Sequence, residues 1–121
     1  MEDERLKNKN FLDACKKALN GIWYSVKTQT NVKIQLVIAV IVIACCFIFK
    51  LTTTECIFLT FATMMVIVTE VMNTAIEATV NLYTDKYHPI AKIAKDVAAG
   101  AVVLSALNAI IVAVLIFFSK F

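Results

Sequence analysis

Three long apolar stretches divide this 121-residue chain, and its polar residues gather before and between them. The stretches cover residues 32–50, 56–82 and 96–118. Each is long enough to cross a hydrocarbon core about 30 Å thick, which takes roughly 20 helical residues. A lipid-exposed segment must satisfy its own backbone hydrogen bonds, so we predict three membrane-spanning helices.

Residues 1–31, before the first of these helices, are polar and have a different periodicity. Their apolar positions recur at steps of three and four: Phe11, Cys15, Ala18, Leu19, Ile22 and Val26. This spacing is typical of an amphipathic helix on a membrane surface, and Trp23 and Tyr24 suit the headgroup layer. On pattern alone, an anchor without chemistry fits equally well. The sequence predicts an all-α membrane protein, residues 1–121, with one surface helix and three transmembrane helices.

Composition narrows the class further. Sixty per cent of the residues are hydrophobic, and there are only two glycines and one proline. A soluble domain of this size could not bury so much apolar surface. The net charge of +3 favours an anionic membrane surface. No compact soluble domain is predicted that would carry a groove-reading element, so we expect no nucleic-acid partner.

Positive charge is distributed unevenly around the three stretches. Ten of the twelve lysines and arginines precede or begin the first stretch, or separate the second from the third: Arg5, Lys7, Lys9, Lys16, Lys17, Lys27, Lys33, Lys86, Lys92 and Lys95. Only Lys50 and Lys120 lie on the other side. Because positive charge resists translocation, we expect the N-terminus and the connection 84–94 to be cytoplasmic.

Polar residues interrupt the second stretch at Glu70, Asn73 and Glu77. At i, i+3 and i+7 they share one helix face, with the carboxylates about 10 Å apart along the axis. Ionisable residues at membrane depth are costly and usually functional. The expected topology brings Lys95 and Asp96, at the start of the third stretch, to the same end of the protein.

Three kinds of function fit this polar group. Buried Glu and Asn side chains can join helices in an oligomer, and they can relay protons or cations in a small carrier. Carboxylates can also hold Mg²⁺ or act as a general base, while a lysine offsets phosphate charge, as phosphoryl transfer requires. The chain has no G-x-x-x-x-G-K-[ST] loop, so a nucleotide would depend on metal, lysine and polar side chains. The spacing leaves all three functions open.

The stretch 70–101 contains E-V-M-N-T-A-I-E, then Y-H, then A-K-D. It resembles the small prokaryotic diacylglycerol kinase family, and the wording K-I-A-K-D-V-A-A-G-A-V is most similar to Gram-positive members that phosphorylate undecaprenol. The resemblance implies a multi-pass enzyme of the bacterial cytoplasmic membrane that uses ATP and Mg²⁺ to phosphorylate a membrane lipid alcohol at the cytoplasmic face. Undecaprenol is the implied acceptor, and diacylglycerol is the alternative. A homotrimer with active sites between protomers is also implied.

The resemblance assigns roles to individual residues. Glu70 would be the general base toward the lipid hydroxyl, and Asn73 would orient Glu70 or a phosphate oxygen. Glu77 would ligate Mg²⁺, and Lys95 would neutralise the transferred phosphoryl group. The residues placed at the nucleotide are Lys86, Tyr87, His88, Lys95, Asp96 and, through the metal, Glu77.

Two positions depart from the family pattern. Gln29 stands where the family usually carries a second acidic metal ligand, so only a neutral carbonyl oxygen is available there for the metal. Asn81 stands where an aspartate is common, which would weaken a network beside Glu77.

Overall fold

Four helices make up the part of the chain described by the computed structural model, which covers the backbone of residues 4–121 and the side chains of residues 10–121. They are α1 (Glu4–Thr28), α2 (Thr30–Ile48), α3 (Thr53–Tyr83) and α4 (Pro89–Lys120). The described residues contain no strand. The predicted all-α class, an N-terminal helix followed by three apolar helices, is confirmed. The first three residues of the expected segment 1–31 lie outside the described residues.

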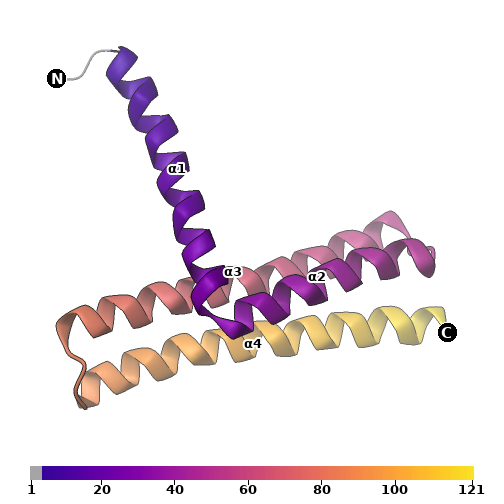
Figure 1. Ribbon diagram of the computed structural model, residues 1–121. Helices are drawn as coiled ribbons and strands as arrows, with labels where there is room; N and C mark the ends of the chain where they lie inside the picture. The colour runs from indigo at the N-terminus through magenta and orange to yellow at the C-terminus, as the bar shows by residue number, and fades with distance from the viewer. Residues whose placement is uncertain (1–3) are drawn as a thin grey trace.

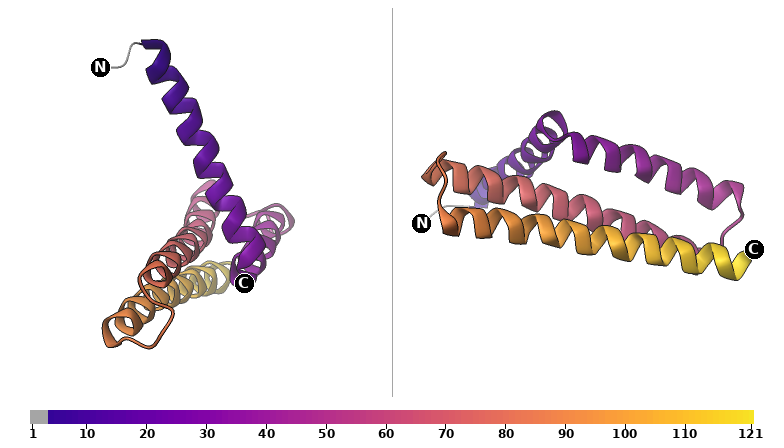
Figure 2. Two further views of the ribbon diagram at one scale, coloured as in Figure 1. Left: turned by 60° about the vertical axis from the view of Figure 1, so that its left-hand side comes forward. Right: turned by 90° about the horizontal axis from the view of Figure 1, so that it is seen from below.

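Helices α2, α3 and α4 lie side by side with alternating directions, while α1 leaves them at a steep angle (Figure 1). The left-hand view in Figure 2 shows α1 extending away from the other helices along most of its length. Its residues are exposed from Asn10 to Tyr24. Since α2, α3 and α4 are each long and apolar enough to cross a membrane, α1 has the orientation of a helix that lies along the membrane surface.

A single residue makes the corner between α1 and α2. Gln29 has extended dihedral angles, φ −111° and ψ 115°, between two helical segments. Its N–H still donates to the Ser25 carbonyl at 2.9 Å, and its own carbonyl accepts from the Lys33 N–H at 3.3 Å. The chain therefore turns sharply at one residue, with a helical hydrogen bond on either side of the corner.

The turn between α2 and α3 is closed by a Schellman motif, in which two N–H groups bond back to the last helical turn. The Leu51 N–H donates to the Cys46 carbonyl at 3.1 Å, and the Lys50 N–H to the Phe47 carbonyl at 3.4 Å. Lys50 has φ 51°, in the left-handed region where glycine is usual. This motif returns the chain directly into α3.

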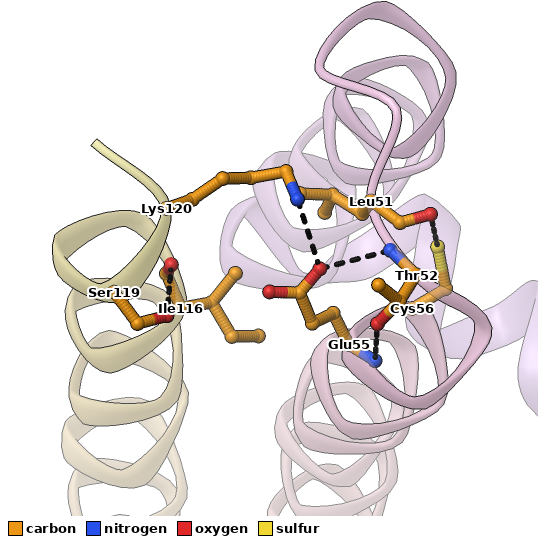
Figure 3. Close-up of polar contacts among 7 residues, drawn as sticks. All are labelled: Leu51, Thr52, Glu55, Cys56, Ile116, Ser119 and Lys120. Atoms are coloured by element: carbon orange, nitrogen blue, oxygen red, sulfur yellow. Dashed lines mark hydrogen bonds and ion pairs between the residues drawn. The ribbon is translucent and has the colours of Figure 1, made fainter.

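Helix α3 begins with a capping box at this turn. The Thr52 hydroxyl accepts from the Glu55 N–H at 3.2 Å, and a Glu55 carboxylate oxygen accepts from the Thr52 N–H at 2.8 Å. The Lys120 Nζ at the end of α4 donates to the same carboxylate oxygen at 3.3 Å (Figure 3). We call this group, Thr52, Glu55 and Lys120, the turn-end clasp.

Helix α4 begins earlier than the apolar pattern indicates. Its first residue is Pro89, and the His88 Nδ1 accepts from the Ile90 N–H at 3.2 Å. Proline at the first position and a side-chain cap before it both favour helix initiation. The expected connection 84–94 is therefore reduced to the short loop Thr84–His88, and Lys95 and Asp96 lie on a helix.

Helix lengths decide where the polar residues lie. At 1.5 Å per residue the 19 residues of α2 extend about 28 Å, whereas the 31 residues of α3 extend about 46 Å. Both helices meet at the same turn, so the last part of α3 extends about 18 Å beyond the start of α2. Helix α4, with 32 residues, accompanies it. This extension carries Asn73 and Glu77, and Glu70 lies just before it, level with the start of α2.

Packing inside the bundle is thin. The buried apolar side chains are Val32, Leu59, Ala62, Val66 and Ile116. Many large apolar side chains on α2, α3 and α4 face outward. Exposing such a surface to water would cost about 25 cal/mol per Å². Lipid or further copies of the chain must therefore cover it.

Candidate active site

One face of α3 carries the predicted acidic residues, and they differ in burial. Glu70 is only 4 % exposed, whereas Asn73 and Glu77 are half-buried. None of the described residues hydrogen-bonds to the Glu70 carboxylate. Glu70 interacts unfavourably with the charge of Glu77 on the same face. A cation bound near this face would offset that repulsion.

The Asn73 amide is hydrogen-bonded to Glu77. One of its expected roles, orienting Glu70, would require a bond to Glu70 instead. The Asn73 Nδ2 donates to the Glu77 Oε1 at 3.3 Å, one helical turn away. Its Oδ1 is buried and has no partner among the described residues. Buried polar atoms are nearly always hydrogen-bonded, so an unsatisfied acceptor beside two carboxylates indicates a place where a donor binds.

Lys95 joins α4 to α3 at the same end. Its Nζ donates to the Asn81 Oδ1 at 2.9 Å. Asn81 follows Glu77 by one turn on α3, so the lysine lies next to the acidic face. Because the Asn81 amide is neutral, Lys95 keeps its full positive charge for another partner. An aspartate at this position would compete for that charge.

The α3–α4 loop and the first turns of α4 enclose a small polar pocket of about 240 Å³. The sequence placed six residues at the nucleotide, one of them, Glu77, through the metal. The other five line this pocket: Lys86, Tyr87, His88, Lys95 and Asp96. We call it the loop pocket. It confirms that these residues lie together, and it leaves their roles as predictions.

The loop pocket contains two charged residues that the sequence reasoning did not select, Asp85 and Lys92. Lys92 lines it and forms an ion pair with Asp96. The i, i+4 spacing of the two residues on a helix was the available signal. The sequence predicted that the third apolar helix begins at residue 96, seven residues after Pro89. Lys92 was therefore expected in a loop, where helical spacing does not apply.

Ser25 and Thr74 are further residues that the sequence reasoning passed over. Both are buried, and they line a groove between α1 and α3. The Thr74 hydroxyl donates to the Glu70 backbone carbonyl at 3.0 Å. The surface helix therefore contacts α3 within about one turn of Glu70. Their only signal in the sequence was a small polar side chain on an otherwise apolar helix face.

Gln29 lies at the corner between α1 and α2, half-buried, and its side chain does not cap α2. Among the described residues, no three His, Cys, Asp or Glu side chains lie close enough together to hold a metal ion. Mg²⁺ commonly uses one or two carboxylates and completes its shell with water and substrate phosphates. Glu77, beside the Asn73 amide, fits such a shared ion.

The sequence matches the family of prokaryotic diacylglycerol kinases over residues 16–117. It is 40 % identical to the undecaprenol kinase of Bacillus subtilis (strain 168) over 121 residues, which covers 98 % of this chain and 97 % of that protein. It is 38 % identical to a diacylglycerol kinase of Synechocystis sp. over 104 residues, 85 % of this chain and 59 % of that protein. The chain belongs to the prokaryotic diacylglycerol kinase family of membrane lipid kinases.

Proposed function

We propose that this protein transfers the γ-phosphoryl group of ATP to the hydroxyl group of undecaprenol at the cytoplasmic face of the bacterial membrane. The observation that carries the choice of acceptor is the similarity to an undecaprenol kinase over almost the full length of both chains. Diacylglycerol is the second candidate, because the other relative is a diacylglycerol kinase. Membership of a family of lipid kinases does not support the alternative function, a carrier coupled to protons or cations.

The geometry supports a direct transfer. Glu70 is buried within an apolar helix long enough to cross a membrane, on the side from which a lipid hydroxyl would approach, and the loop pocket lies at the loop end of α3 and α4. Glu70 accepts the hydroxyl proton as the lipid oxygen bonds to the γ-phosphorus and the bond from that phosphorus to the bridging oxygen of ADP breaks. Lys95 lines the loop pocket and bonds to Asn81 on α3, and it offsets the charge of the transferred group.

Metal binding would rest on Glu77. Its carboxylate is oriented by the Asn73 amide, and Mg²⁺ supplies charge neutralisation on the phosphates when bound. Gln29 would add only a neutral oxygen. We therefore expect Gln29→Glu to lower the Mg²⁺ concentration needed for half-maximal activity, measured by titration at saturating ATP. An unchanged titration would remove Gln29 from the metal site.

The arrangement in the membrane follows from the same proposal. The N-terminus and the loop Thr84–His88 lie in the cytoplasm with α1 along the inner surface, and three copies assemble so that neighbouring protomers complete each site. Single-cysteine labelling at Lys27 and Lys50 tests the orientation. Only a variant with its cysteine at Lys50 should react with an impermeant reagent in intact cells, with the four natural cysteines replaced.

The acceptor is tested by phosphate transfer from radiolabelled ATP in detergent micelles that contain Mg²⁺. Undecaprenol should be phosphorylated faster than diacylglycerol at equal mole fraction, and Glu70→Gln should slow both reactions about 1,000-fold. Faster turnover of diacylglycerol would reverse the assignment, and no turnover of either lipid would overturn the proposed function.

A further inference from the structure

Four lysine or histidine side chains surround the loop pocket, and two acidic side chains accompany them. Lys95 is held by neutral Asn81, and Lys92 is held by Asp96. Lys92 and Lys95 follow each other at i, i+3 on α4, so their like charges repel across one turn. An anion placed in this pocket would relieve that repulsion.

The position of Lys92 in α4 is unfavourable for a merely structural ion pair. Lys92 lies in the first turn of α4, and no acidic residue is present in that turn. The positive end of the helix dipole repels a cation there. The pair also has the less stabilising order, with its base preceding its acid. Asp13 and Lys17 on α1 form an exposed i, i+4 pair with the favourable order, at 3.2 Å.

The Lys92–Asp96 pair is easily exchanged. The two side chains are 60 % and 63 % exposed, so water screens their attraction and can replace either partner. Each member also has a better partner in a metal–triphosphate complex. A lysine ammonium binds phosphate oxygens, and a carboxylate binds Mg²⁺. The first turn of α4 faces the same pocket through Ala91 and adds the attraction of a helix N-terminus for anions.

We propose that Lys92 is a phosphate-binding residue of this kinase and that its ion pair with Asp96 is the nucleotide-free state, which opens when the metal–triphosphate complex binds. Lys92 then moves to a phosphate oxygen and Asp96 moves to the metal, directly or through a bound water molecule. This inference rests on the proposed function, because it requires ATP to enter the loop pocket. It adds to Lys95 a second lysine on α4 that binds the triphosphate.

The test measures binding of a non-hydrolysable ATP analogue to the purified protein in micelles, without any lipid substrate. Lys92→Met keeps the aliphatic side chain and removes the charge, and it should weaken analogue binding in the presence of Mg²⁺ about tenfold. Lys92→Arg should restore most of that loss. Lys17→Met is the matched control, since it breaks an exposed pair of the same spacing outside the pocket and should leave the dissociation constant unchanged.

Asp96→Asn separates the two steps of the exchange, the release of Lys92 to a phosphate oxygen and the movement of Asp96 to the metal. Without Mg²⁺, loss of this carboxylate removes a repulsion and frees Lys92, so the analogue should bind more tightly than to the unchanged protein. With Mg²⁺, the same variant loses an oxygen ligand or its water-mediated equivalent and should bind more weakly. An effect of the same sign under both conditions would overturn the exchange.

Failure of this inference is distinguishable from failure of the proposed function. If the unchanged protein binds the analogue and phosphorylates lipid, but Lys92→Met and Lys17→Met bind the analogue equally well, only the role of Lys92 is wrong. If the unchanged protein neither binds the analogue nor transfers phosphate, the proposed function itself is overturned.

Discussion

The two ends of the α3–α4 pair contain similar polar residues in opposite states. At the turn end, the Glu55 carboxylate accepts hydrogen bonds from the Thr52 N–H and from Lys120. Toward the loop end, in the second half of α3, the Glu70 carboxylate has no partner among the described residues, and the buried Asn73 Oδ1 has none either. Satisfied polar groups hold a fold together, whereas unsatisfied ones cost stability and persist where a ligand completes them. We therefore expect the turn end to support the fold and the residues toward the loop end to carry the chemistry.

The largest predicted effect comes from removing the charge of one carboxylate at each end. Glu70→Gln should lower the rate of phosphate transfer about 1,000-fold, since it removes the proposed general base. Glu55→Gln should leave the transfer rate of the folded protein nearly unchanged. Both rates are measured with saturating undecaprenol and ATP, and helix content is checked by circular dichroism. Equal losses in the two variants would break the comparison.

Asn73→Ala should separate activity from stability. The substitution frees Glu77 and should reduce phosphate transfer about 10- to 100-fold. It also removes a buried acceptor that lacks a partner, a group that costs about 1–3 kcal/mol. The melting temperature in detergent should therefore stay the same or rise. A variant that loses stability together with activity would show that Asn73 supports the fold.

The turn-end clasp should show the reverse behaviour. Lys120→Met and Glu55→Gln should each lower the melting temperature by a few degrees, because each removes the ion pair between α3 and α4. Transfer rates measured well below that temperature should not change. The double variant should have the same melting temperature, within measurement error, as the less stable of the two single variants. Additive losses would mean that the two residues act independently.

The smallest predicted effect concerns Lys50 in the turn. A residue other than glycine in the left-handed region is strained, so Lys50→Gly should stabilise the protein by about 1 kcal/mol. Lys50→Ala controls for the lost charge and should not stabilise it. The difference is measured by thermal unfolding of the two variants in the same detergent. Equal stability of both would show that the turn carries no strain.

Much of the site was predictable because it lies on one continuous helix. The spacing of Glu70, Asn73 and Glu77 requires them to share a face wherever α3 packs. Their partners were not predictable in the same way. Helical periodicity allows Asn73 to face either carboxylate, and only the side-chain rotamers in the structure bond it to Glu77.

Contacts between helices were the least predictable. The Lys95–Asn81 bond joins residues 14 positions apart across a loop, and the Glu55–Lys120 bond joins residues 65 positions apart. Neither follows from periodicity, since each depends on the relative register of α3 and α4. The early start of α4 at Pro89 belongs to the same class, because the apolar pattern marks where lipid contact begins and not where the helix begins.

The sequence by itself determined the membrane class, the number of apolar helices and the family, because hydrophobic length and a long motif are local properties of the chain. The tertiary structure decided how far α3 and α4 extend beyond α2, which residues meet in the loop pocket, and which polar atoms remain without partners. These features depend on the register and rotation of packed helices. Small differences in packing energy, summed over many side chains, set that register, and no single stretch of sequence encodes it.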